Sequence, residues 1–181
     1  MASRRLVLVR HSKAGDGDTD LERPLTERGR HDAAAIGGWL DRLALAPDQA
    51  VVSPARRTVE TWEHVCALLP TTARTVIDGR IYENTVAALL AVIRDTAVDV
   101  TTLALVGHNP SIEALANDLD DGHGAAVARA ELAGGYPTSG VAVFTLHTPF
   151  ADVQPSAATL THFAVPRGVV GRPDHPRIDP D

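Results

Sequence analysis

Residues 6–15 read LVLVRHSKAG, and this stretch decides the fold of the chain. Its first four residues form an unbroken apolar run, as expected of a strand that is buried on both faces of a parallel sheet. The run passes directly into a group of polar residues, namely Arg10, His11, Ser12 and Lys13. Ligands of open α/β sheets bind at the carboxyl ends of the strands. This strand is therefore expected to end at a binding site.

Five more short stretches have the Val and Leu content of strands and are bounded by turn residues. The predicted strands cover residues 5–9, 50–52, 75–77, 103–106, 141–146 and 159–165. Helices are predicted between the first four strands, because apolar residues recur there at helical spacing. The apolar stripes fall at residues 62–69, 86–93 and 112–119.

A longer helix is predicted over residues 26–44, with Thr26 as its N-cap and Ile36 and Leu40 facing inward. Gly37 and Gly38 count against this helix, because glycine lowers helix propensity.

Alternation of strands and helices predicts an α/β fold, a three-layer α/β/α sandwich around a mostly parallel central sheet. The last two strands leave no room for a helix between them, so the sheet is expected to include an antiparallel strand. We expect a single domain over residues 1–165. Residues 166–181 hold four prolines and few apolar residues, and are expected to form an irregular C-terminal tail.

The composition is that of a globular protein, with 44% hydrophobic residues. A net charge of −6 argues against a nucleic-acid partner, since such proteins carry a basic excess. The single cysteine, Cys66, allows neither an intramolecular disulfide nor a cysteine-based zinc site. The sequence contains neither a signal-peptide core nor an apolar run long enough to cross a membrane. We therefore expect a cytoplasmic protein with no membrane partner.

Polar residues follow three of the predicted parallel strands. Arg10 and His11 follow the first strand, Ser53 to Arg57 follow the second, and Gly107 to Pro110 follow the fourth. The carboxyl ends of parallel strands lie at one edge of the sheet, so these junctions are expected to surround a single pocket.

Such a pocket gathers two histidines with two or three arginines, and clustered buried cations are costly unless they are paired. A phosphate group resolves this conflict, because guanidinium groups bind its oxygens in a bidentate manner. Ser53 and Asn109 are expected to cap the helices that follow, each with a proline in the first turn. Taken alone, His108 could equally be a buried histidine that hydrogen-bonds to the backbone. Arg56 and Arg57, taken alone, could lie on a solvent-exposed face of a helix.

Together these motifs resemble the histidine phosphatase superfamily, which includes phosphoglycerate mutases and acid phosphatases. The resemblance rests on Arg10-His11, on SPARRT at residues 53–58 and on GHNP at residues 107–110. Among its branches the chain is most similar to the SixA-type phosphohistidine phosphatases, through RHSKA at 10–14, ERPLTERGR at 22–30 and VGHNPSIEALA at 106–116. The resemblance spans residues 4–165 and implies a phosphoglycerate mutase-like fold.

The resemblance also implies roles for individual residues. His11 would be the nucleophile that takes the phosphoryl group as phosphohistidine, and Arg10, Arg57 and His108 would hold the phosphate oxygens. Water would then release phosphate. Side chains supply the positive charge in this scheme, so neither a metal nor a cofactor is expected.

The chain departs from the family pattern at several positions. Ser12 replaces the usual glycine, and Lys13 stands where many relatives carry an acidic residue; both are candidate phosphate ligands, as is Asn109. Glu83 is the candidate proton donor for a leaving group, with electrostatic support of a helix N-terminus as its alternative role. Asn109 stands where acid phosphatases carry an aspartate, which argues against that branch.

The leading hypothesis is a metal-independent phosphatase that acts on phosphohistidine in another protein, because an imidazole leaving group makes a weak demand on a proton donor. The alternatives are a phosphatase for small phosphomonoesters, with Glu83 as donor, and a phosphate-binding module without catalysis. A mutase and a histidine-based metal hydrolase are less favoured. The phosphorylated partner and the oligomeric state stay open at this point.

Overall fold

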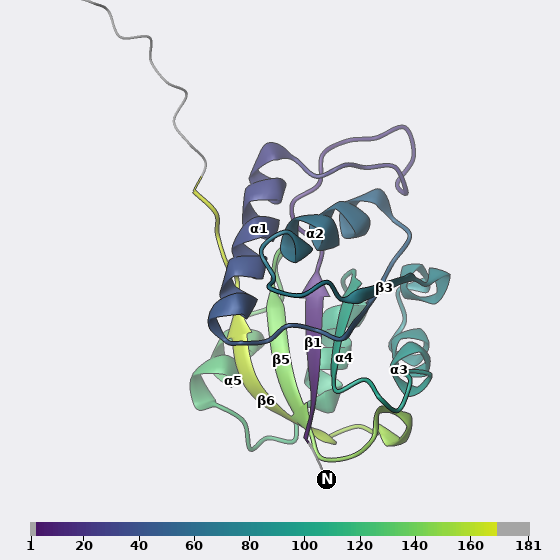
Figure 1. Ribbon diagram of the computed structural model, residues 1–181, viewed down its shortest axis with the longest axis vertical. Helices are drawn as coiled ribbons and strands as arrows, with labels where there is room; N and C mark the ends of the chain where they lie inside the picture. The colour runs from purple at the N-terminus through teal and green to yellow at the C-terminus, as the bar shows by residue number, and fades with distance from the viewer. Residues whose placement is uncertain (1–2, 170–181) are drawn as a thin grey trace, which may run out of the picture.

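In a computed structural model, which describes residues 3–169, the chain folds around one six-stranded sheet (Figure 1). The strand order is β3-β2-β4-β1-β5-β6. The strands are β1 (Arg4–Arg10), β2 (Gln49–Val52), β3 (Arg74–Ile77), β4 (Thr102–Gly107), β5 (Val141–Leu146) and β6 (Ala158–Ala164). The helices are α1 (Glu27–Arg42), α2 (Arg56–Cys66), α3 (Val86–Arg94), α4 (Ser111–Leu119) and α5 (Ala126–Ala133), with short 3₁₀ turns η1 (Gly79–Glu83) and η2 (Phe150–Asp152).

Strand β1 occupies the centre of the sheet. It pairs in parallel with β4 on one side and antiparallel with β5 on the other. Strands β2 and β3 continue the parallel part, whereas β6 pairs antiparallel with β5 and so runs in the direction of β1. The predicted mostly parallel sheet with an antiparallel strand is confirmed, and β5 is that strand.

Residues of β1 alternate between two apolar cores, one on each face of the sheet. Val7 and Val9 pack with residues of α1 and α2, while Leu6 and Leu8 pack with residues of α3, α4 and α5. All four side chains are fully buried. Each such burial contributes about 1.5–3 kcal/mol of transfer free energy. The helices thus cover both faces, and the predicted three-layer α/β/α sandwich is confirmed.

Helix α1 begins as predicted, because the Thr26 hydroxyl accepts a hydrogen bond from the Gly29 amide. The two other predicted caps are wrong. Helix α2 begins after Ala55 and helix α4 after Pro110, and neither has a side-chain cap. The Ser53 hydroxyl and the Asn109 amide instead make the contacts described below for the pocket.

Helix α5 has no counterpart among the predicted elements. Its sequence, AVARAELA, contains good helix formers, but only Ala128 and Leu132 are buried. This is too narrow an apolar stripe to produce a clear helical period. None of the helices in the described part of the chain has the length and apolar character needed to cross a membrane.

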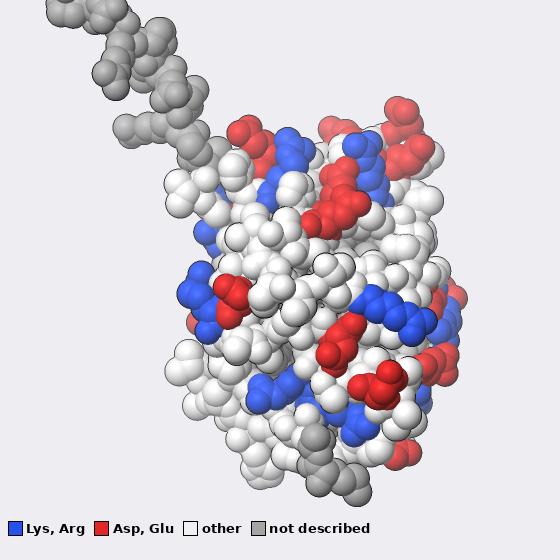
Figure 2. Space-filling model, viewed as in Figure 1, with Lys and Arg blue, Asp and Glu red and all other residues white. Residues whose placement is uncertain are grey.

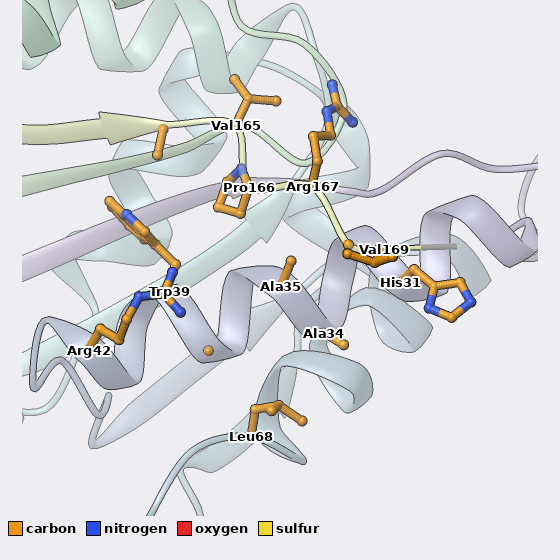
Figure 3. A pocket seen from close by; sticks show the side chains of 13 residues that line it. His31, Ala34, Ala35, Trp39, Arg42, Leu68, Val165, Pro166, Arg167 and Val169 are labelled. Atoms are coloured by element: carbon orange, nitrogen blue, oxygen red, sulfur yellow. The ribbon is translucent and has the colours of Figure 1, made fainter. Parts of the chain in front are cut away.

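The chain beyond β6 runs along α1 without helix or strand up to Val169, and the rest of the predicted tail, residues 170–181, lies outside the described residues. Asp32 of α1, whose side chain is fully buried, holds this segment. Its carboxylate accepts hydrogen bonds from Arg167 (2.7 Å) and from the Gly168 amide (3.0 Å), and pairs with Arg28 (2.9 Å). A hollow of about 530 Å³ lies beside this segment, bordered by Trp39 and neighbouring residues (Figure 3).

Helices α1 and α2 approach closely at Gly37. A Cβ atom at this position would overlap the Val65 carbonyl oxygen and lie 2.9 Å from the Leu68 Cβ. Backbone atoms cannot move aside easily, so the close approach requires glycine here. Gly38, the next residue, has only the end of the Arg42 side chain nearby, at 3.7 Å.

We therefore expect Gly37→Ala to lower the free energy of unfolding by about 1–3 kcal/mol through overpacking. Gly38→Ala is the matched control and should raise it by up to about 1 kcal/mol through helix propensity. Urea denaturation of both variants measures the difference. Equal effects of the two substitutions would contradict the packing argument.

Candidate active site

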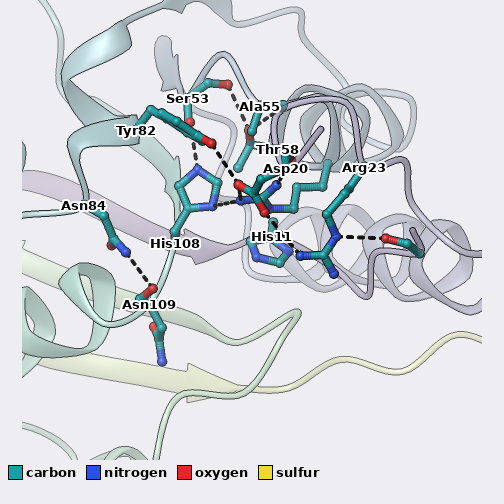
Figure 4. A network of polar contacts seen from close by, with 12 residues as sticks. His11, Asp20, Arg23, Ser53, Ala55, Thr58, Tyr82, Asn84, His108 and Asn109 are labelled. Atoms are coloured by element: carbon teal, nitrogen blue, oxygen red, sulfur yellow. Dashed lines mark hydrogen bonds and ion pairs between the residues drawn. The ribbon is translucent and has the colours of Figure 1, made fainter. Parts of the chain in front are cut away.

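The three predicted junctions meet at one pocket of about 310 Å³ (Figure 4). Arg10 and His11 come from the end of β1, Arg57 from the first turn of α2, and His108 and Asn109 from the loop after β4. Parallel pairing is the reason, since Arg10 lies beside Gly107 in the register of β1 and β4. The pocket is completed by Asp20 and Arg23 of the loop after β1, by Tyr82 of η1, and by Asn84, which directly follows η1.

The ring of His11 is held in a defined protonation pattern. Its Nδ1 lies 2.8 Å from the Ser12 carbonyl oxygen. A carbonyl only accepts, so Nδ1 carries the proton and Nε2 keeps a free lone pair. Burial lowers the pKa of His11 to about 4, and the nearby Arg57 and Arg10 act in the same direction. His11 is thus neutral at pH 7 and suited to nucleophilic attack through Nε2.

The second histidine, His108, is also held on both ring nitrogens. Its Nε2 lies 2.8 Å from the Ser53 hydroxyl and its Nδ1 lies 3.3 Å from Nη2 of Arg57. Because a guanidinium only donates, Nδ1 accepts and Nε2 donates to Ser53. Burial, followed by the charges of His11 and Arg57, lowers the pKa of His108 to about 3. The rings of His11 and His108 lie 5.3 Å apart between centroids.

Arg57 is oriented by Asp20, a residue of the loop after β1. The guanidinium is almost fully buried and donates to the Asp20 carbonyl (2.6 Å) and carboxylate (3.0 Å). The Tyr82 hydroxyl donates to the same carboxylate at 2.8 Å. Hydrogen bonds from Tyr82 and Arg57 lower the pKa of Asp20 to about 2. Asp20 is therefore ionised at neutral pH and is a weak base.

Arg10 is fixed by backbone rather than by a carboxylate. Its Nη1 donates to the Tyr136 carbonyl at 2.7 Å. Burial lowers its pKa, with Glu113 acting in the opposite direction. Within residues 3–169, the buried Nε atoms of both Arg10 and Arg57 have no hydrogen-bond partner. Both guanidinium groups line the pocket, and their permanent positive charges suit a multiply charged anion.

Three of the candidate residues do not line the pocket. Glu83 is exposed at the end of η1, while its neighbours Tyr82 and Asn84 line the wall, because successive residues of a tight 3₁₀ turn point in different directions. Lys13 is exposed, and its backbone carbonyl accepts hydrogen bonds from the amide and the hydroxyl of Thr26.

Ser12 is fully buried and faces the protein interior, where its hydroxyl accepts from the Ser139 hydroxyl at 2.8 Å. The φ angle of Ser12 is not positive, so its backbone conformation does not require glycine. Asn109 does line the pocket, and its amide donates to the Tyr136 carbonyl and to Glu113.

Four pocket residues were not among the candidates, namely Asp20, Arg23, Tyr82 and Asn84. All four lie in a loop or in η1 and not at the end of a strand. Arg23 lies within ERPLTERGR, one of the stretches on which the family resemblance rests, so the sequence did contain a sign of its role. Its side chain donates to the Gly15 carbonyl and pairs with Asp20. Within residues 3–169, no three His, Cys, Asp or Glu side chains are grouped so that they could hold a metal ion.

Comparison with known proteins agrees with this arrangement. The sequence profile of the histidine phosphatase superfamily (branch 1) matches residues 6–86, which include Arg10, His11 and Arg57. An uncharacterized protein of Mycobacterium tuberculosis is 38% identical over 162 residues, covering 88% of this chain and all of the relative.

Two solved structures are similar to this chain over most of its length. One from Nakamurella multipartitia, assigned as a phosphohistidine phosphatase SixA, aligns with a TM-score of 0.81 at 29% identity, over 92% of this chain and 98% of its own. A second, assigned in the same way and from Agrobacterium tumefaciens, aligns with a TM-score of 0.72 at 28% identity, over 90% of this chain and 99% of its own.

The pKa values of the two pocket histidines can be tested without turnover. We expect the rings of His11 and His108 to titrate at about pH 4 and about pH 3 in NMR spectra. The histidines of the urea-unfolded chain provide the reference, near 6.5. Between these values the unfolded chain binds more protons than the folded one, so stability falls as pH drops from about 6.5 to about 3. Titration of both rings near 6.5 in the folded protein would contradict the electrostatics described here.

Proposed function

Because the chain belongs to the histidine phosphatase superfamily and is a phosphatase, we propose that it acts through a phosphohistidine intermediate on His11 and dephosphorylates phosphohistidine in another protein. The observation that carries the proposal is the hydrogen bond from His11 Nδ1 to the Ser12 carbonyl. It fixes the proton on Nδ1 and leaves the Nε2 lone pair of a pocket-lining ring free to attack phosphorus. The single cysteine suits a cytoplasmic setting.

The reaction has two displacements. Nε2 of His11 attacks phosphorus, the bond from phosphorus to the substrate imidazole breaks, and the departing nitrogen keeps the electron pair and takes a proton from solvent. Water then attacks the phosphohistidine, the bond to Nε2 breaks, and the water proton passes to solvent or to the released phosphate. Arg10 and Arg57 carry the positive charge that offsets the negative charge on the phosphoryl oxygens in both steps.

None of the three side chains considered as proton donors, Asp20, Asn109 and Glu83, is suited to protonate an alkoxide leaving group. An alkoxide needs an acid that is protonated at pH 7. Asp20 lines the pocket but is ionised, Asn109 presents an amide, and Glu83 lies outside the pocket lining. An imidazole leaving group depends less on a proton donor, which favours phosphohistidine over a phosphomonoester as substrate. The likeness to SixA phosphohistidine phosphatases points to the same substrate class.

Trapping of the intermediate tests the proposal. We expect rapid acid-free quenching after mixing with phosphoramidate to leave one phosphate on the chain, stable in base and labile in acid, which maps to His11. His11→Ala should carry no label and should lose turnover. Turnover by His11→Ala at the wild-type rate would overturn the nucleophile assignment. Phosphate binding without label or turnover in the wild-type protein would favour the non-catalytic binding module.

The adjacent arginines offer a matched pair for the phosphate-binding role. Arg57→Ala should slow formation of the phosphorylated enzyme by roughly 10²–10³-fold, as expected for loss of one preorganised charge. Arg56→Ala removes an equal charge one residue away, where the guanidinium pairs with Glu60 at 2.6 Å outside the pocket. We expect it to retain nearly the wild-type rate. Equal losses from both substitutions would indicate a general charge effect.

Substitution of Glu83 separates the two substrate classes. We expect Glu83→Gln to leave hydrolysis of a phosphohistidine peptide and of a phosphoserine peptide unchanged, with the phosphoserine peptide hydrolysed slowly by both proteins. Steady-state rates across pH 5–9 measure this. A selective loss on phosphoserine would identify Glu83 as a proton donor and support the alternative of a phosphomonoester phosphatase.

A further inference from the structure

The Ser12 carbonyl is the group that selects the protonated nitrogen of His11, so the orientation of the peptide after Ser12 bears on the reaction. Two hydrogen bonds hold Ser12 in place. Its amide donates to the Thr61 hydroxyl of α2 at 3.0 Å, and its hydroxyl accepts from the Ser139 hydroxyl at 2.8 Å. All three side chains are fully buried. Ser12 is thus held from two sides, by α2 and by the loop before β5.

The loop of residues 134–140 contacts the end of β1 at several points. The Ser139 amide donates to the His11 carbonyl at 3.2 Å, and the Gly140 carbonyl accepts from the Arg10 amide at 3.0 Å. The Tyr136 carbonyl accepts from the side chains of Arg10 and Asn109. This loop therefore fixes the backbone on which His11 stands.

Ser139 adopts a conformation that serine rarely takes. Its φ is +65°, in the left-handed region where glycine is the usual residue. Glycine at this position would keep the amide hydrogen bond to His11 and avoid the unfavourable φ, but would lack the hydroxyl. An unfavourable backbone conformation at a fully buried residue points to a role for the side chain.

We propose that Ser139 is a positioning residue, whose hydroxyl bond to Ser12 holds the Ser12 carbonyl as acceptor and thereby keeps His11 in its Nδ1–H tautomer. The inference rests on the proposed role of His11 as nucleophile. Without the bond between the hydroxyls, the Ser12 side chain no longer helps to fix the peptide after Ser12, and only backbone contacts, such as those of Ser12 with Thr61 and of His11 with Ser139, remain. The ring of His11 then exchanges between tautomers, and only the molecules protonated on Nδ1 present a free Nε2 lone pair.

Ser139→Gly and Ser12→Gly remove this bond from either side, and each leaves the backbone contacts of the loop possible. Ser156→Gly is the matched control, since Ser156 also has positive φ (+55°) but is exposed in the segment that connects β5 and β6. The first readout is the tautomer of His11 at pH 7, from nitrogen-15 chemical shifts of the unphosphorylated protein. The second is the rate of the nitrophenolate burst with p-nitrophenyl phosphate.

For Ser139→Gly and Ser12→Gly we expect a measurable Nε2–H fraction and a burst roughly 10–100-fold slower, with little change in KM. The double variant should be no slower than the slower single variant, because both substitutions remove the same bond. Ser156→Gly should match the wild-type protein in both readouts. A pure Nδ1–H signal together with a wild-type burst in Ser139→Gly would overturn the inference.

The two proposals fail in different ways. The tautomer is measured without turnover, so it reports on Ser139 even where His11→Ala retains activity and the nucleophile assignment falls. If Ser139→Gly slows the burst but leaves the tautomer unchanged, Ser139 does not act through the His11 proton and the inference is likewise overturned.

Discussion

The parallel pairing of β1 with β4 is the constraint on which the site depends. Its register sets Arg10 beside Gly107, so that His11 and His108 leave the sheet at adjacent points of one edge. The His11 amide donates to the Gly107 carbonyl and the Ser53 amide to the Val106 carbonyl, which extends the ladder just beyond the strands. Because side chains alternate along a strand, a slip of one residue would turn His11 toward the opposite helical layer. The same slip would exchange the two apolar cores, so packing and pocket geometry are secured together.

Burial of cationic groups serves both the fold and the chemistry of the pocket. Desolvation keeps His11 and His108 neutral, which lets each ring accept a hydrogen bond or attack an electrophile. The permanent charge of Arg57 is compensated by Asp20, and Arg10 is supported by a backbone carbonyl. A phosphoryl group entering the pocket meets donors that are already oriented, and little reorganisation is needed.

The strand ends were predictable from the sequence, because apolar runs that stop at histidine and arginine mark both the strands and the edge where they open. The lining contributed by Asp20, Tyr82 and Asn84 was not predictable in the same way. It depends on the path of a loop and on a 3₁₀ turn that ends at Asn84 with φ of +58°, and neither leaves an apolar period. Glu83 was the candidate proton donor, but the turn directs its neighbours Tyr82 and Asn84 into the pocket instead. The caps assigned to Ser53 and Asn109 failed for a related reason, since tertiary partners compete for the same polar atoms.

The central position of β1 has a consequence for biosynthesis. Among the six strands of the sheet, β1 is synthesised before the others, yet its partners are β4 and β5, which begin at Thr102 and Val141. Until those segments emerge, Leu6–Val9 has no edge to pair with, and the nascent chain carries an unsatisfied apolar strand. Because Ser139 also lies near the start of β5, the surroundings of His11 are completed only when most of the domain has been made. Translation speed over the middle of the chain thus sets how long this apolar strand stays without its partners.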